Sequence, residues 1–188
     1  MLNKRGRILL VGSAMWYFGE GMFGPLFAVF AQDIGGNILD VTNAWAVFMV
    51  VTGVCTILVG RVADHFAKRN GREILMITGY ALNAALTFVY LGVSTPTQLL
   101  WVQAGLGLAV ALSASTWLSL FSHSTLHEKS SSAWSLESGI QKIVDAAAIV
   151  IGGYIVTHYS FAVLFFIMGC IQTMATIYQA RILWAPRQ

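Results

Sequence analysis

A charged segment separates two apolar runs of the chain, and over residues 60–72 it reads GRVADHFAKRNGR. The runs on either side, residues 43–60 and 74–93, consist almost wholly of apolar and small residues. A helix needs about 20 apolar residues to cross a bilayer, and basic residues gather where such helices leave the membrane. The segment therefore predicts two membrane-spanning helices joined by a short charged loop.

The composition of the whole chain supports a membrane protein. Of its 188 residues, 57% are hydrophobic and only 10% are charged, and the mean hydropathy is +0.71. Soluble domains carry about 25% charged residues, so this chain has too few to cover a surface that faces water. These values exclude a soluble enzyme, a disordered tail and a nucleic-acid-binding module, and two cysteines are too few for a disulfide scaffold.

Six apolar runs have the length of a membrane span, and no strand-like alternation persists between them. We expect an all-α integral membrane protein that forms a single six-helix transmembrane domain over residues 1–188. The predicted spans are about 8–31, 43–60, 74–93, 99–121, 139–157 and 161–183.

The first run follows basic residues, as a secretory signal peptide would. At about 24 residues it is too long for the apolar part of a signal peptide, and it carries Glu20 near its middle. We therefore interpret it as a retained helix. Pro25, with three glycines nearby, makes this helix the one most expected to bend or break.

The basic residues predict the orientation in the membrane. Ten of the eleven lie in the N-terminal segment, the loop after the second run, the loop after the fourth run and the C-terminal segment, and Lys142 follows in the first turns of the fifth span. Loops rich in Lys and Arg face the cytoplasm. We therefore expect an integral protein of the cell membrane with both termini in the cytoplasm.

The charged segment resembles the signature loop of the major facilitator superfamily, which reads roughly G-x-L-A-D-R-x-G-[RK]-[RK] between the second and third helices. The matching residues are Gly60, Ala63, Asp64, Lys68 and Arg69. Val62 is a conservative replacement, whereas His65 stands where the family has Arg and Ala67 where it has Gly. The position after the second apolar run is a second, independent part of the match.

The resemblance covers the chain as one six-helix half of a transporter that works by alternating access. It implies that Asp64 bridges to the other half and that Gly60, Asp64, Lys68 and Arg69 form a conformational latch. A charged loop that only fixes topology is the alternative. From the residues alone, we also expect Gly60 to permit close approach in the turn.

Members of this family usually have two such halves, and one half does not enclose a path by itself. Because both termini are expected on one side, two copies can lie parallel about a two-fold axis. We expect a homodimeric secondary transporter of a small solute, with the path at the dimer axis. The alternatives are one half of a longer or split transporter, a non-transporting scaffold and a passive conduit.

Three charged residues inside the spans are candidates for the transport site: Glu20, Lys142 and Asp145. Ionisable groups in a bilayer are costly and are therefore functional candidates by default. Glu20 lies near the middle of the first span, and the resemblance places that span beside the cavity, so we expect Glu20 to carry a coupled proton. A structural, hydrogen-bonded carboxyl is the alternative. Lys142 and Asp145, three residues apart on one helix, form either an ion pair or a gate.

Four further residues complete the predicted cavity: Trp16, Tyr17, Gln103 and Trp117. The two residues of the first span could stack on an aromatic or cationic ligand, although packing explains them equally well. Gln103 and Trp117 are included because the resemblance places the fourth span beside the cavity. Carboxylates and aromatic residues together favour a cationic or amphipathic organic solute.

The sequence contains no glycine-rich phosphate loop, nucleophile elbow or metal-binding cluster. We therefore expect no enzyme activity, no cofactor, no metal site and no transport driven by ATP bound to this chain. The expected partners are the lipid bilayer, a second copy of the chain and a small-molecule substrate, but not nucleic acid.

Overall fold

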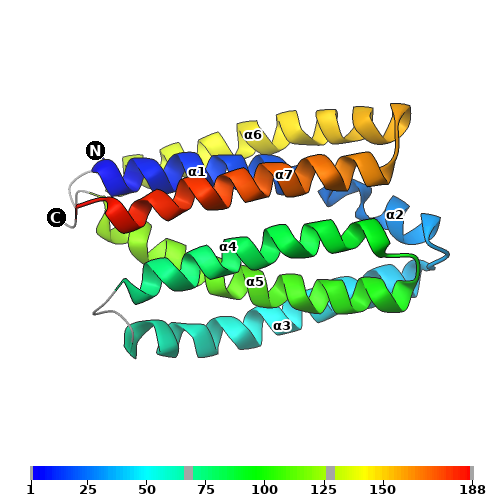
Figure 1. Cartoon of the computed structure of the whole chain (residues 1–188), viewed down its shortest axis with the longest axis horizontal. Coiled ribbons are helices and arrows are strands. Elements are labelled where there is room, and N and C mark those ends of the chain that lie inside the picture. The colour runs from blue at the N-terminus through cyan, green and yellow to red at the C-terminus, as the bar shows by residue number, and fades with distance from the viewer. Residues whose placement is uncertain (1, 66–69, 126–129, 187–188) are drawn as a thin grey trace.

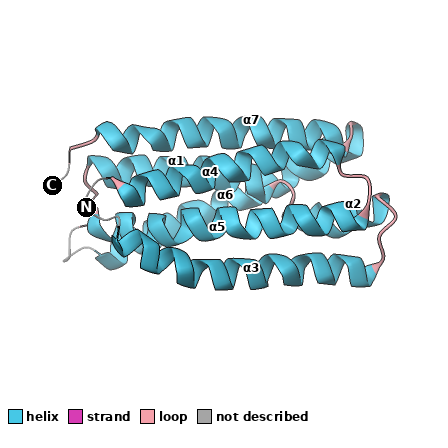
Figure 2. Cartoon of the chain, turned by 60° about the horizontal axis from the view of Figure 1, so that its bottom comes forward, coloured by secondary structure: helices cyan, strands magenta, loops and turns pink. Residues whose placement is uncertain are grey.

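The computed structural model describes residues 2–65, 70–125 and 130–186. The described residues form helices joined by short turns (Figure 2). The α-helices are α1 (Lys4–Gly21), α2 (Phe27–Asp33), α3 (Ile38–His65), α4 (Gly71–Val89), α5 (Pro96–His123), α6 (Ser130–His158) and α7 (Phe161–Ala180). Short 3₁₀ turns lie at Gly24–Leu26, Tyr90–Gly92 and Arg181–Trp184.

Five of these helices are long and apolar enough to cross a membrane: α3, α4, α5, α6 and α7. The fold is therefore all-α, as predicted. The remaining predicted span, residues 8–31, is divided between α1 and α2. The 3₁₀ turn at the break contains Pro25, which lacks the N–H that a continuous helix would use. The expected break near Pro25 is confirmed.

The helices extend beyond the apolar runs that predicted them. The clearest case is α6, which begins at Ser130, whereas the predicted span begins at residue 139 and its preceding loop was expected to run through residue 138. The helix continues because Ser, Trp and Glu in this stretch include no helix-breaking residue. The expected boundary was therefore wrong by more than two turns.

The helices pack in the order α3, α5, α4, α7, α1, α6. In Figure 1, α4 and α7 lie at the front and α6 lies behind them. Thus α3 and α6 are at the two ends of the series, and they flank the face that is opposite α4 and α7. Both chain termini lie at one end of the bundle (Figure 1), where Asn3 N–H donates to the carbonyl of Ser124 over 3.4 Å.

Two clusters of buried side chains form the core. The cluster nearer the termini contains Leu9, Met76 and Phe121. The other is rich in aromatic rings: Phe23 contacts Phe30, Tyr90 and Phe165 with ring centroids 5.0–5.8 Å apart. These three rings come from α2, from α7 and from the 3₁₀ turn that follows α4. Together they pack around the residues at the break in the first span.

A close helix contact also fixes the position of this break. Gly152 of α6 lies against the main chain of Met22, and a Cβ atom at Gly152 would overlap the Met22 carbonyl group. The neighbouring Gly153 has no such constraint, since a Cβ atom there would meet nothing within 4 Å. Only a glycine at 152 allows α6 to approach the end of α1 this closely.

Candidate functional site

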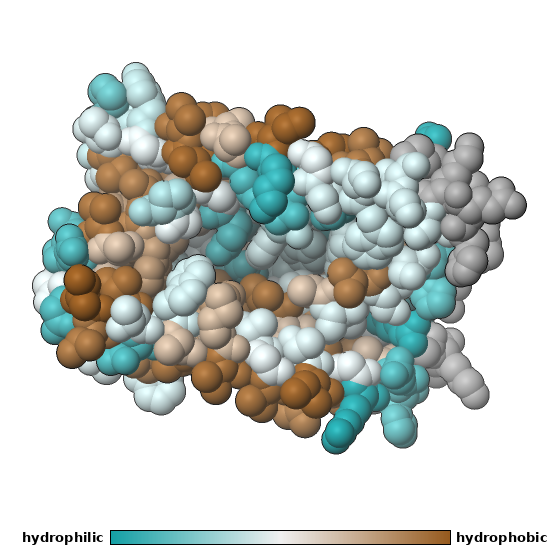
Figure 3. Space-filling model, turned by 180° about the vertical axis from the view of Figure 1, so that it is seen from behind, coloured by the Kyte–Doolittle hydropathy of each residue, from teal (hydrophilic) through white to brown (hydrophobic). Residues whose placement is uncertain are grey.

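A groove runs along the face between α3 and α6, and Figure 3 shows this face hollowed, with hydrophilic residues around the hollow. One part of the groove, about 290 Å³, lies between α1, α5 and α6. A second part, about 310 Å³, lies between α1 and α6. The two parts share Trp16, Tyr17 and Gln141, so they form one continuous groove.

Aromatic side chains form most of one wall. Trp16 of α1 makes edge-to-face contacts with Tyr17 and with Tyr80 of α4, at centroid distances of 5.2 and 5.9 Å. Trp117 of α5 and Trp134 of α6 continue the wall, and their ring centroids are 6.4 Å apart. The predicted residues Trp16, Tyr17 and Trp117 all line this part of the groove.

Trp16 and Trp117 differ in the hydrogen bonding of their indole nitrogens. Trp117 Nε1 donates to the main-chain oxygen of Leu9 over 3.4 Å, which fixes its ring between α5 and α1. Trp16 Nε1 is buried and has no acceptor among the described residues. An unpaired donor costs free energy in a buried place, so the Trp16 indole N–H, unlike that of Trp117, adds no hydrogen bond to the packing of the described helices.

Glu20 lies where the groove meets a deeper cavity of about 120 Å³. Gln103 of α5 and Phe48 of α3 line that cavity with it. Gln103 donates from Nε2 to the hydroxyl of Tyr90 over 3.1 Å. The fold therefore brings Glu20 and Gln103, which are far apart in the sequence, to the same cavity.

A buried hydrogen-bond chain connects Glu20 to α4. Gln172 of α7 donates from Nε2 to Glu20 Oε2 over 3.0 Å, and its Oε1 accepts from the hydroxyl of Thr87. The Thr87 hydroxyl also lies 3.0 Å from the main-chain oxygen of Asn83. Because Gln172 is fully buried, its amide depends on these two partners for its hydrogen bonds.

Two further carboxyl groups line the groove. Glu137 of α6 is only 7% exposed and accepts a hydrogen bond from Ser138 over 3.4 Å. Asp145 lies about two helical turns after Glu137 on α6. It lines the same part of the groove as Glu20. Carboxylates from α1 and α6 thus face the same space.

Lys142 does not join them. It is exposed on α6 and lines none of the three cavities, and it makes no ion pair with Asp145 within 4.0 Å in the described structure. The two residues are neighbours on α6, but the described structure shows no ion pair between them, and only Asp145 lines the groove.

Of the predicted latch residues, Gly60 and Asp64 lie on the last turns of α3, at the end of the bundle that holds the termini. Arg72 Nη2 donates to Asp64 Oδ1 over 2.8 Å, and the Asp64 side chain is 77% exposed. Gly60 does not serve a close contact between α3 and α4, since a Cβ atom there would meet nothing within 4 Å. Lys68 and Arg69 lie outside the described residues.

Sequence reasoning gave too little weight to Gln172 and did not single out Thr87, Tyr80 or Trp134. Gln172 is only one of several glutamines in the apolar runs, and nothing in the sequence distinguishes it from the others. Its partner Glu20 is 152 residues away in the sequence. Gln172 can be recognised by its position beside an intramembrane carboxyl group, and that position is known only once the helices are packed.

The comparison with known families covers almost the entire chain. A family model described as Major Facilitator Superfamily matches residues 9–188. No curated protein matches the chain. The match includes every residue of the groove described above.

Proposed function

We propose that this chain, which belongs to the major facilitator superfamily, moves an organic cation in exchange with or together with protons, by alternating access, as a parallel homodimer. The family indicates a membrane transporter. The substrate class, the proton coupling and the dimer are our proposals. The observation that supports the substrate class and the proton coupling is Glu20, a carboxyl group that faces the groove and is hydrogen-bonded to the interior of the bundle through Gln172.

The hydrogen-bond chain supports a role in carrying a proton, because an amide can bridge Glu20 and Thr87 in two orientations. When Glu20 is ionised, it accepts from the NH₂ group of Gln172, and the Gln172 oxygen accepts from the Thr87 hydroxyl. When Glu20 is protonated, it donates to the Gln172 oxygen, and the NH₂ group donates to Thr87.

The Thr87 hydroxyl has one hydrogen, so its bonding changes with the amide. In the first orientation that hydrogen goes to Gln172. In the second it is released to the Asn83 carbonyl, which lies 3.0 Å away. Glu20 therefore keeps a hydrogen bond to Gln172 in both protonation states, and gain or loss of a proton in the groove alters a bond on α4.

The lining of the groove supports an organic cation as the substrate. Aromatic faces attract cations through their ring quadrupoles, and five aromatic side chains stand near Glu137: Trp16, Tyr17, Tyr80, Trp117 and Trp134. Among the described residues, no Lys or Arg lines any of the three cavities. Carboxyl groups and aromatic rings without a competing cation favour a positively charged, partly apolar solute.

Two rows of small residues support a second six-helix body on the groove face. Ala46, Gly53 and Gly60 recur every seven residues on α3, and Gly139, Ala146 and Gly153 do so on α6. A Cβ atom at any of these four glycines would meet nothing within 4 Å. In a bilayer, rows of small residues allow helices to pack closely, and these rows have no partner helix within the described chain.

A parallel homodimer would pair the two rows with each other, α3 of one copy against α6 of its partner. Gly60 and the exposed Asp64, near the end of α3, would then lie at the same contact, with Lys68 and Arg69 following them in the sequence. We propose the latch at this place, with Arg72 holding the Asp64 carboxylate before it bridges to the partner. One half of a longer or split transporter, with a different body over the groove, is the second candidate.

Transport in liposomes with a trapped pH-sensitive dye tests the proposed function, with tetraphenylphosphonium as the probe cation. We expect the cation to move protons with the native chain and not with Glu20→Gln. Asp33→Asn, a carboxyl group outside the groove, is the matched control and should behave as the native chain does. Full cation-dependent proton movement in Glu20→Gln would contradict proton coupling through this residue.

A further inference from the structure

A further cavity lies away from the groove and from the deeper cavity beside Glu20, at the end of the bundle that holds both termini. It measures about 800 Å³ and lies between the first turns of α1 and the last turns of α7. Its lining residues are Leu2, Lys4, Arg7, Ile8, Tyr178, Arg181, Trp184 and Ala185. None of them belongs to the groove, so the transport site does not account for this cavity.

The cavity carries three cationic side chains and, among its lining residues, no carboxylate. Lys4 and Arg7 are three residues apart and therefore lie on one face of α1, and Arg181 lines the cavity with them from the 3₁₀ turn that follows α7. The ion pairs in the described structure engage Arg5 with Glu73 and Arg72 with Asp64 instead. The charge of Lys4, Arg7 and Arg181 is thus left uncompensated within the described chain.

Aromatic and apolar side chains complete the cavity. The Arg181 guanidinium lies 4.9 Å from the ring centroid of Tyr178, which holds it at the rim. Ile8 and Ala185 are buried beneath, whereas Trp184 is 79% exposed. Exposed tryptophans mark the level of the lipid headgroups. A site that is cationic on one side and apolar on the other fits an anionic amphiphile better than a free anion.

A separate apolar groove lies next along the same faces of α1 and α7. It measures about 510 Å³ and is lined on α1 by Leu10, Val11, Ala14, Met15 and Phe18, on α7 by Ile171 and Met174, and on α6 by Ile140 and Val144. The α1 residues follow Lys4 and Arg7 at spacings of three and four, and the α7 residues precede Tyr178 and Arg181 in the same way. The two cavities therefore form one seam.

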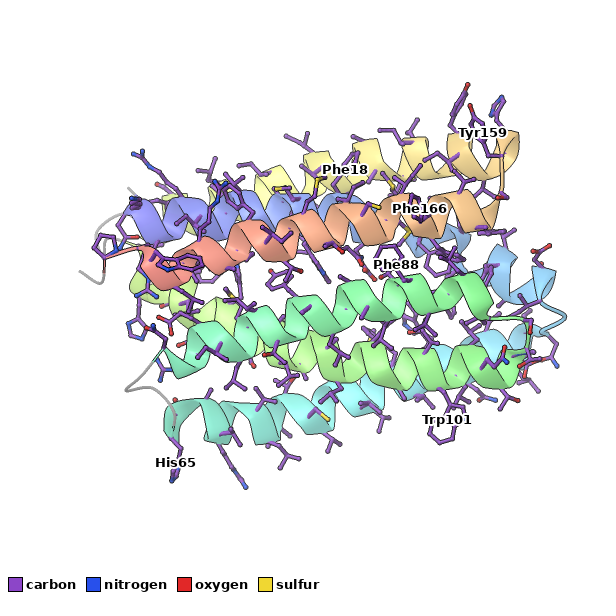
Figure 4. The ribbon with its side chains drawn as sticks, viewed as in Figure 1. Phe18, His65, Phe88, Trp101, Tyr159 and Phe166 are labelled. Carbon is purple, nitrogen blue, oxygen red and sulfur yellow. The ribbon has the colours of Figure 1, made fainter. Side chains whose placement is uncertain are left out.

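The length of the seam matches an acyl chain in one leaflet. From Arg7 to Phe18 a helix rises about 16 Å, and half the hydrocarbon thickness of a bilayer is about 15 Å. Phe18 closes the inner end, between the levels of α6 and α7 in Figure 4.

We infer that this seam binds one anionic phospholipid. Its phosphate would lie among Lys4, Arg7 and Arg181, and an acyl chain would follow the apolar groove to Phe18. Inorganic phosphate could satisfy the three cations, but it would leave the apolar groove unused. The site therefore depends on the whole lipid, and it is independent of the proposed transport function.

Native mass spectrometry of the purified full chain, after exchange into equal mixtures of phosphatidylglycerol and phosphatidylcholine, tests this inference. We expect retention of one phosphatidylglycerol in preference to phosphatidylcholine. Because each basic residue near a membrane surface contributes about 1 kcal/mol, Arg7→Gln should lower that preference about fivefold, and the triple change at Lys4, Arg7 and Arg181 about a hundredfold. Arg61→Gln, an exposed basic residue on α3, should leave it unchanged.

A second variant tests the acyl-chain part. Ala14→Phe fills the apolar groove and leaves the three cations in place, and it should reduce phosphatidylglycerol retention at least tenfold. Glycerophosphoglycerol, the same headgroup without acyl chains, should not be retained. Equal retention of both lipids by the native chain would overturn the inference. So would an unchanged preference in Arg7→Gln, or retention of glycerophosphoglycerol or inorganic phosphate as strong as that of the lipid.

Discussion

Gln172 of α7 donates a hydrogen bond to the carboxylate of Glu20 of α1, over 3.0 Å, and the same amide accepts a hydrogen bond from Thr87 of α4. Three helices therefore meet at one side chain beside the groove. Replacing Gln172 with an apolar residue of similar volume tests whether its amide transmits the protonation state of Glu20 or whether the side chain only packs between the helices.

We predict that Gln172→Leu reduces cation-driven proton movement in liposomes at least tenfold while the protein still folds. Leucine has a similar volume but no amide, so Glu20 loses its donor and Thr87 its acceptor. Gln179→Leu is the matched control, because Gln179 lies on the same helix and is equally buried but bonds to neither Glu20 nor Thr87. Equal loss of activity in both variants would indicate a packing defect.

The two charged residues of α6 should differ in their effect on transport. Asp145 faces the groove, whereas Lys142 is exposed outside it. We therefore expect Asp145→Ala to lower the transport of tetraphenylphosphonium about tenfold or more, and Lys142→Ala to leave it within about twofold. Transport measured in the double variant should equal that in Asp145→Ala. Recovery in the double variant would instead demonstrate an ion pair between the two residues.

The contact between α6 and the break in the first span gives a prediction about stability. Gly152→Ala places a Cβ atom on the Met22 carbonyl, so the two helices must move apart. Overpacking of this kind costs about 1–3 kcal/mol, and we expect a lower midpoint of thermal unfolding in detergent. Gly153→Ala adds the same atom one residue later, where nothing lies within 4 Å, and should unfold as the native chain does.

Part of this structure could be predicted from the sequence, because the membrane constrains it strongly. Apolar runs predict the helices, and Pro25 predicts the break, since a missing N–H within an apolar run interrupts the interior of a helix. The helix ends were harder to predict: α6 begins at Ser130 because polar residues outside the apolar region are also compatible with a helix.

The candidate site could be predicted only in part. An intramembrane carboxylate is exceptional in the sequence, so Glu20 attracted attention by itself. Gln172 became important only through its partners on α1 and α4, which lie 152 and 85 residues away. For Lys142 and Asp145, helical spacing gives the two residues as neighbours on α6, but it does not tell which of them lines the groove that the packed bundle leaves open.

The proposed homodimer predicts a specific cross-link between α3 and α6 of different copies. Phe48 and Asp145 each share a cavity with Glu20, so they mark its level on α3 and α6. Gly53 lies five residues beyond Phe48, and Gly139 lies six residues before Asp145. Because α3 runs toward the end that holds the termini and α6 runs away from it (Figure 1), both glycines lie about 8–9 Å from the level of Glu20 on the same side.

Cysteines at these two positions, in a chain with Cys55→Ala and Cys170→Ala, should form an intermolecular disulfide on oxidation in membranes. Gly53→Cys or Gly139→Cys alone should give no dimer, since a two-fold axis keeps identical rows apart. The matched control combines Gly53→Cys with Ile177→Cys, which lies five residues from Gln172 on the exposed face of α7. A cross-linked dimer that forms with the first pair, but not with the control pair, supports the homodimer. No dimer, or equal dimer from the control pair, contradicts it and favours a different body over the groove.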